Sequence, residues 1–201
     1  MPTATRRRAL GLLATLIVAN ATADVVPADE TAPVAQEVLK AFIKYLDGLR
    51  KTGSKDFAFA PYTETYPGSQ PGATSDVDSM MSIIPGMSRA VAQDFLRVNS
   101  RSVAVVLPVA PGRKASPTIV EAETLSRLFQ QPHGWERFHK EFPEAACLIR
   151  ISRVGIDEHA GQALIWCSIS SGMLSGGTDL MLLERKNGVW AVTKQKVLAV
   201  S

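Results

Sequence analysis

The sequence feature that most constrains the fold is a hairpin signal near the C-terminus, the dipeptide Asn187-Gly188. Long stretches rich in apolar and β-branched residues precede and follow it, from Asp179 to the end of the chain. Asparagine and glycine both accept the positive φ angles of a two-residue turn between antiparallel strands. The pattern therefore predicts a β-hairpin, in which Arg185 faces Trp190 across the strands and packs its guanidinium on the indole ring.

A second hairpin is expected just before this one. Residues 148–152 and 163–167 are apolar runs of strand length, and the segment 157–161 between them has the charged residues and the glycine typical of a turn. The glycine-rich segment 171–177 then predicts a tight connection between the two hairpins, with residues at positive φ. Together these segments predict an antiparallel meander of about four strands.

The two cysteines, Cys147 and Cys167, lie in or beside the strands of the earlier hairpin. If the residue numbers of two residues that face each other across the strands add up to an even number, both cysteine side chains project from the same face of the sheet. A sum near 314 would place them directly opposite each other. We expect a disulfide between them, because the N-terminal segment described below predicts export, and the oxidising compartment outside the cytoplasm allows the pair to form. The alternative is a pair of buried, reduced thiols.

The N-terminal half carries helical patterns instead. The expected elements are helices at 33–51, 88–98, 120–130 and 135–142, short strands at 56–60 and 102–106, and loops at 61–78 and 108–117. No internal repeat and no second domain boundary is visible. We therefore expect one α+β domain over residues 33–201, with the N-terminal helices packed on the C-terminal meander.

The first 23 residues are typical of a secretory signal peptide. Arginines at positions 6–8 precede an apolar stretch of eleven residues, and the small residues at 21–23 provide a cleavage site before Asp24. Such a stretch is shorter than the about 20 residues that a membrane-spanning helix needs. We expect a periplasmic or secreted protein with a linker at 24–32 and no stable membrane insertion after cleavage. Sec and twin-arginine export both stay open, and an uncleaved anchor is the alternative.

The charge balance argues against a nucleic-acid partner. The chain contains 22 Lys and Arg residues and 19 Asp and Glu residues. The signal segment holds three of the basic residues and no acidic one, so the remainder carries 19 of each. Binding to nucleic acid through phosphate neutralisation needs a surplus of cations, which the remainder lacks.

No arrangement of side chains in the sequence specifies a reaction. Weak candidates for acid–base catalysis are His139, Glu136 and Asp179. His133, Glu136 and His139 recur every third residue, whereas zinc ligands on one helix prefer the i, i+4 spacing, so no metal site is expected. The glycine-rich segment lacks both a Gly-Lys-Ser/Thr sequence and a following helix, so no cofactor is expected either.

Five short motifs follow one another in the C-terminal half: Trp135 to Phe138 with Phe142-Pro143, Ser152 to Gly155, Ala163-Leu164, Gly172 to Gly176, and Leu182 to Trp190. In this order they resemble a pattern of exported bacterial proteins of unknown function, W-x-x-F…F-P, S-x-x-G, A-L, G-x-L-x-G and L-L-E-K-x-N-G-x-W. The resemblance implies an exported domain without an assigned activity. The last hairpin also resembles that of NTF2-like domains, in which a curved sheet and helices enclose a cavity.

Two classes of function fit these observations. The favoured one is a non-catalytic domain that binds a small molecule or a protein partner in the bacterial envelope. Its site would be a cavity or groove against the sheet, lined by residues such as Phe138 and Trp166. The alternative is an exported hydrolase or an NTF2-like cavity enzyme with a His/Glu acid–base group.

Overall fold

The structure is a computed structural model that describes residues 33–50, 54–67 and 73–200. The expected signal peptide at 1–23 and linker at 24–32 lie outside the described residues. In chain order the elements are α1 (Pro33–Leu49), β1 (Asp56–Phe59), α2 (Val77–Ile83), α3 (Arg89–Val98), β2 (Thr118–Ile119), α4 (Ala122–Phe129), α5 (Gly134–Glu141), β3 (Ala145–Ile151), β4 (Gly155–Asp157), β5 (Gln162–Gly172), β6 (Ser175–Lys186) and β7 (Val189–Val200).

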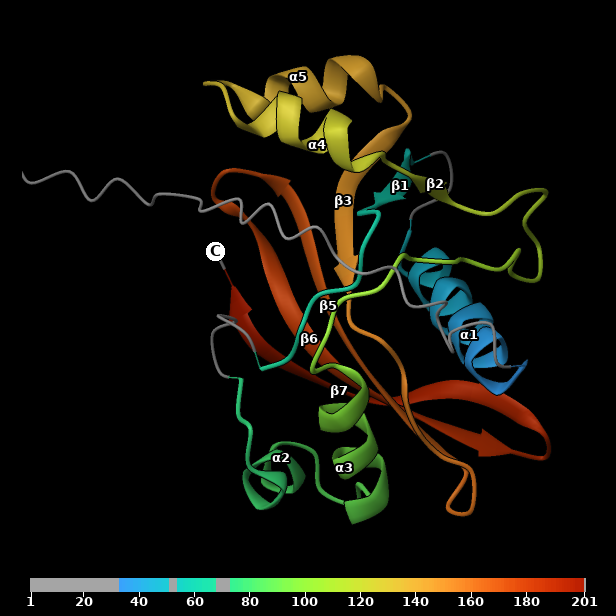
Figure 1. Cartoon of the computed structure of the whole chain (residues 1–201). Coiled ribbons are helices and arrows are strands. Elements are labelled where there is room, and N and C mark those ends of the chain that lie inside the picture. The colour runs from blue at the N-terminus through green and yellow to red at the C-terminus, as the bar shows by residue number, and fades with distance from the viewer. Residues whose placement is uncertain (1–32, 51–53, 68–72, 201) are drawn as a thin grey trace, which may run out of the picture.

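One mixed sheet of seven strands forms the centre of the fold (Figure 1). Its order is β2-β1-β3-β5-β6-β7, and β4 pairs with β5 off this path. β1 runs parallel to both of its neighbours, β2 and β3, while β3 to β7 pair in antiparallel fashion. The expected α+β class is confirmed, but the prediction of about four strands is wrong, because β1 and β2 extend the sheet and β4 continues it beyond β3.

The C-terminal hairpin is confirmed in detail. Asn187 and Gly188 form the turn between β6 and β7, with φ angles of 52° and 80°. Arg185 pairs with Trp190, and its guanidinium carbon lies 5.5 Å from the centre of the ring. In the connection at 171–177, by contrast, the exposed pair Met173 and Leu174 forms the tip, and no residue has the positive φ that was expected there.

The helices at 33–51, 88–98, 120–130 and 135–142 are confirmed as α1, α3, α4 and α5, with ends shifted by a few residues. The strand expected at 102–106 is wrong, since Ala104 forms only an isolated bridge with Tyr62. Val103 and Val105 are nevertheless buried, so the alternating valines of this segment indicated burial rather than strand pairing. α2 begins at the end of the segment expected to be a loop.

α1 covers one face of the sheet. Its buried side chains, among them Phe42 and Ile43, pack on Ile165, Cys167 and Met181 in the largest apolar cluster of the fold. Because neighbouring strand residues point to opposite faces, Leu164 and other alternate residues of β5 and β6 face away from α1. Both faces of the central strands are therefore covered, which explains why β5 reads as a continuous apolar run.

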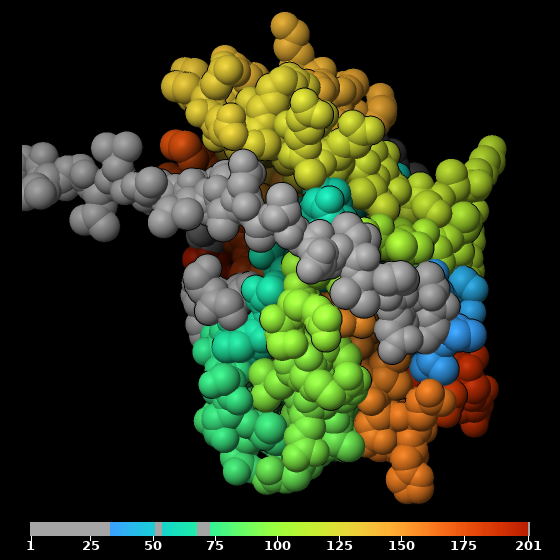
Figure 2. Space-filling model, in the orientation of Figure 1, coloured from blue at the N-terminus to red at the C-terminus, as the bar shows by residue number. Residues whose placement is uncertain are grey.

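Two helix pairs cover the opposite face. α2 and α3 pack on Leu164 and Trp166, while α4 and α5 pack on Ala58 and Leu148. Leu148 lies opposite Ser170 on β5, so both helix pairs share one face of the sheet. Figure 2 shows them at opposite ends of the molecule, with the polypeptide that follows β1 between them in Figure 1.

The register of β3 and β5 corrects the disulfide prediction. Cys167 lies opposite Ile151, so paired positions add up to 318 rather than 314. The even sum places both cysteines toward α1, but Cys147 lies four residues further along β3, about 13 Å away at the usual rise per residue. A disulfide needs Cα atoms within about 7 Å. Both cysteines are free.

Candidate functional site

A groove of about 550 Å³ lies where α4 faces the chain segment that follows β1. It falls within the range of about 300–1,000 Å³ that small-molecule sites occupy. Most of its lining is apolar, and its polar groups are few. The groove is lined by Ala60, Pro61, Tyr62, Glu64, Ala122, Leu125, Ser126, Phe129, Gln130 and Arg150. An open, largely apolar hollow with a few polar groups is suited to binding an amphipathic molecule.

The segment 60–64 forms one side of the groove and is fixed to the sheet by backbone hydrogen bonds. The Ala60 amide donates to the Ile149 carbonyl at 2.9 Å, and the Glu64 amide donates to the Ile151 carbonyl at 2.8 Å. Between these contacts, Tyr62 pairs with Ala104 in an isolated bridge. The segment thus continues the line of β1 beside β3, so its side chains have a defined position relative to Arg150.

The amphipathic helix α4 forms the other side. Leu128 is buried against the sheet, while Leu125 and Phe129 are only partly buried and line the groove. The Phe129 ring lies edge-on to Trp135 of α5, with 5.0 Å between the centroids. The α4–α5 pair is also joined by Arg127, which donates to both carboxylate oxygens of Glu141 at 2.6 and 2.8 Å. The apolar wall is therefore supported from behind by α5.

The groove contains one pair of opposite charges. The Arg150 Nε atom lies 3.5 Å from the Glu64 Oε1 atom, and the two side chains are 34% and 38% exposed. Arg150 lies on β3, between residues that face α1, and so projects to the face that carries α4. The pair sits beside the apolar wall but remains accessible to solvent.

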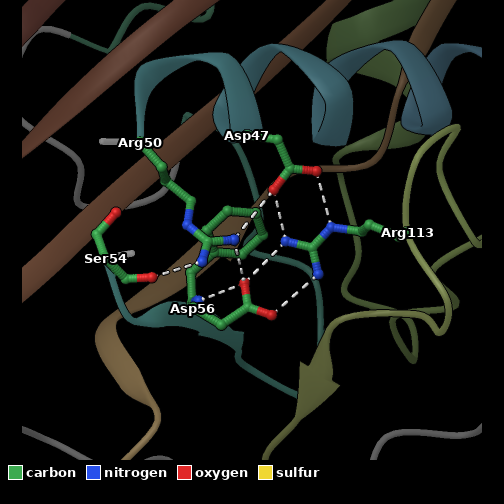
Figure 3. A network of polar contacts seen from close by, with 6 residues as sticks. Asp47, Arg50, Ser54, Asp56 and Arg113 are labelled. Atoms are coloured by element: carbon green, nitrogen blue, oxygen red, sulfur yellow. Dashed lines mark hydrogen bonds and ion pairs between the residues drawn. The ribbon is translucent and has the colours of Figure 1, made fainter. Parts of the chain in front are cut away.

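A second hollow, of about 440 Å³, lies beside a network of two arginines and two aspartates (Figure 3). Arg113 donates to both oxygens of Asp47 and to both oxygens of Asp56, at distances between 2.7 and 3.1 Å. Arg50 bridges the same two carboxylates at 3.2 and 3.0 Å. Both guanidinium groups lie over the Phe57 ring, at 5.5 Å for Arg50 and 4.6 Å for Arg113.

The electrostatics of this network are those of a structural clamp. Burial alone would raise the pKa of Asp56, but hydrogen bonds from Arg113 and from the Phe57 amide, with the nearby guanidinium charges, hold that pKa below its usual value. Hydrogen bonds to Asp47 and Asp56 raise the pKa of Arg113 despite its burial. Two positive and two negative charges offset one another, and the network joins α1, β1 and the loop at 108–117.

The structure does not bring the three catalytic candidates together. His139 and Glu136 lie on α5 and Asp179 lies on β6, and none of them lines either hollow. The carboxylate of Glu136 contacts the ring of His133, at 3.0 Å, in an exposed pair. This part of the prediction has no support from the geometry.

His139 is used as a structural link. Its Nε2 atom lies 3.0 Å from the Ser171 carbonyl oxygen, and its Nδ1 atom lies 3.3 Å from that of Ala145. The ring also packs against Phe138, with 5.4 Å between the centroids. Both nitrogens therefore face backbone acceptors, and His139 lines neither of the two hollows described above.

Asp179 lies nine-tenths buried on β6, with its Oδ1 atom lacking a hydrogen-bond partner. Burial and the charge of Asp179 raise the pKa of Tyr45, whose hydroxyl donates to Gln195 at 2.6 Å.

Burial raises the pKa of Cys147 to about 11 and that of Cys167 further still. Both thiols are thus protonated near neutral pH and unsuited to nucleophilic catalysis.

Phe138 and Trp166, expected to line a cavity, are buried in the two helix-covered clusters instead. The groove is formed by residues that sequence analysis did not single out, because Glu64 and Arg150 meet only through the pairing of β3 with the segment after β1. A partial signal was present in Leu125 and Phe129, which are large apolar residues within the helix expected at 120–130.

Within the described part of the chain, no three His, Cys, Asp or Glu side chains gather in a way that could hold a metal ion. No helix in residues 33–50, 54–67 and 73–200 has the length and hydrophobicity of a membrane span. In comparisons with known proteins, no family model, no curated protein and no solved structure matches this chain.

Proposed function

We propose that this chain is an exported, non-catalytic binding domain of the bacterial envelope that takes up a small molecule in the groove beside α4. The observation that carries the proposal is the groove itself, which combines an apolar wall from Leu125 and Phe129 with the charged pair of Glu64 and Arg150. A site of this composition binds an amphipathic molecule without needing a catalytic group. The site would act in the periplasm or outside the cell.

Export is supported by the sequence rather than by the fold. The basic residues at 6–8, the apolar stretch after them and the small residues at 21–23 have the order of a secretory signal. The motif series from Trp135 to Trp190 resembles exported bacterial proteins, and the balanced charge of the remaining chain disfavours a nucleic-acid partner.

The groove is tested by filling it. In Ser126→Trp an indole is added on the groove side of α4, whereas in Glu123→Trp the same ring is added on the exposed side of the same helix. Both variants and the parent chain are purified from the exported fraction and examined by native mass spectrometry. We expect additional bound mass on the parent chain and on Glu123→Trp, and its loss from Ser126→Trp. Equal bound mass on all three proteins would contradict the proposal.

The same spectra test export. The mass of the purified chain identifies the N-terminal residue, and we expect a chain that begins at Asp24. A chain that retains residues 1–23 would contradict export with cleavage of the leader.

The alternative of a hydrolase or cavity enzyme keeps its own test. An acid–base role for His139 predicts that His139→Ala loses an activity while the fold persists. We expect instead a loss of stability of about 1–2 kcal/mol, because the variant removes the contacts to the Ser171 and Ala145 carbonyl oxygens. A measured activity that disappears in this variant at unchanged stability would favour the enzyme.

A further inference from the structure

The charged pair in the groove is loosely joined. The Arg150 Nε atom lies 3.5 Å from the Glu64 Oε1 atom. Charge-assisted hydrogen bonds normally span about 2.7–2.9 Å. The contacts between Arg127 of α4 and Glu141 of α5 span 2.6 and 2.8 Å in this same structure. The groove pair therefore has hydrogen-bonding capacity that its own contact does not use.

The unused capacity is of both signs. Among the described residues, Glu64 and Arg150 make no other side-chain hydrogen bond or ion pair. A carboxylate can accept several hydrogen bonds, and the terminal nitrogens of a guanidinium form a fork that matches a carboxylate. The groove thus offers one acceptor for a cation and one donor fork for an anion, side by side.

The positions of these two groups are set by the backbone. The Glu64 amide donates a hydrogen bond to the Ile151 carbonyl on β3. Arg150 precedes Ile151 on that strand and pairs with Ser168 on β5. Elements held in a sheet position a site more accurately than mobile loops do. The spacing between the backbone positions of Glu64 and Arg150 is therefore a property of the fold.

We infer that the groove binds a free α-amino acid with a large apolar side chain; this inference rests on the proposed function of the groove. The ammonium and carboxylate of an α-amino acid are attached to one carbon, so they can face Glu64 and Arg150 together. The side chain then lies against Leu125 and Phe129. A purely anionic ligand would meet repulsion from Glu64, and a purely cationic one would meet repulsion from Arg150.

Three probes with the same phenyl group separate these contributions. L-Phenylalanine carries both charges, phenethylamine carries only the ammonium, and 3-phenylpropionate carries only the carboxylate. In isothermal titration calorimetry with the parent chain, we expect L-phenylalanine to bind about 10- to 100-fold more tightly than either singly charged probe, the usual effect of one hydrogen-bonded charge. Equal affinities for the three probes, or no binding of L-phenylalanine and L-leucine, would overturn the inference.

Two variants assign the charges: Glu64→Gln keeps the shape of the side chain, and Arg150→Gln shortens it but keeps a polar end. Arg150→Gln should weaken L-phenylalanine by about 10- to 100-fold and remove any binding of 3-phenylpropionate, with phenethylamine unchanged or stronger. Glu64→Gln should weaken L-phenylalanine by a similar factor but leave 3-phenylpropionate unchanged or stronger. Arg101→Gln, at an exposed position that does not line the groove, is the matched control and should bind like the parent chain.

The failure of this inference can be told from the failure of the proposed function. If Ser126→Trp removes a bound molecule while the three probes bind equally, the groove is a binding site that does not recognise the amino-acid charges. If Ser126→Trp changes neither bound mass nor probe affinity, the groove is not the site. Thermal unfolding of each variant identifies any that fails to fold, and the comparison of probes on the parent chain then decides alone.

Discussion

The clamp formed by Asp47, Arg50, Asp56 and Arg113 predicts a large stability effect for one substitution, Arg113→Met. Methionine keeps an apolar stem over the Phe57 ring but removes the guanidinium. Arg113 is only 12% exposed and makes four hydrogen bonds to the two carboxylates. The variant therefore leaves two aspartates that share a single remaining cation, Arg50.

The magnitude follows from the exposure of the partners. Each hydrogen bond to a charged group contributes about 1.5–3 kcal/mol, but the four bonds of one guanidinium do not add. Asp47 and Asp56 are 27% and 41% exposed, so water screens part of the interaction, and Arg50 stays within 3.2 Å of Asp47. We expect Arg113→Met to lower the free energy of unfolding by about 2–3 kcal/mol, or the melting temperature by about 5–10 °C.

The pH dependence provides the decisive check. The folded-state pKa of Asp56 is lowered, so its contribution to stability is present above its unfolded-state pKa of about 4 and is lost as the pH falls through the lower folded-state value. In urea unfolding, the difference between the parent chain and Arg113→Met should therefore be largest near pH 7 and smaller at pH 3. Arg101→Met, at an exposed position, is the control and should change stability by less than about 0.5 kcal/mol. A difference between Arg113→Met and the parent that is absent at pH 7, or equal at both pH values, would refute the reasoning.

Three further predictions concern backbone and thiols. Gly155→Ala should cost about 3 kcal/mol in a urea titration, because the added Cβ would lie 2.5 Å from the Cα atom of Phe95, and near-normal stability would show that the contact relaxes easily. Gly188→Ala, at φ +80° with open space around it, should cost only about 1 kcal/mol by the same measurement, and a cost equal to that of Gly155→Ala would contradict a purely conformational effect. Thiol titration of the unreduced, unfolded protein should detect both Cys147 and Cys167, whereas detection of neither would contradict the β3–β5 register.

Local signals in the sequence predicted the local parts of the fold. Asn187-Gly188 was sufficient for the C-terminal hairpin, because the turn, the flanking pattern and the facing Arg185 and Trp190 all lie within a few residues. The helix at 88–98 was equally accessible, since Ser88 caps it by accepting from the Val91 amide at 3.1 Å. Such elements are determined by interactions between near neighbours, which a sequence pattern records directly.

The register of the earlier hairpin was not accessible in this way. The turn after β4 makes paired positions of β4 and β5 add up to 319, and a break between β4 and β3 changes the sum to 318. In that break, the Ser152 hydroxyl accepts from the Trp166 amide at 2.9 Å, and the Asn99 side chain accepts from the Arg153 amide at 2.7 Å. A contact from a distant helix thus contributes to the alignment, and no rule about turns could have supplied it.

The candidate site depends on non-local pairing even more strongly. β1 joins β3 in parallel, which places the end of β1 and the segment 60–64 beside Arg150. Neither Glu64 nor Arg150 belongs to a recognisable sequence motif. In the sequence alone, each of them is an ordinary surface charge. They form the charged pair of the groove only because the sheet brings them together beside α4. For this chain, most of the helices and the C-terminal turn were therefore predictable from the sequence, whereas the groove follows from the parallel pairing of β1 with β3, which the sequence pattern did not reveal.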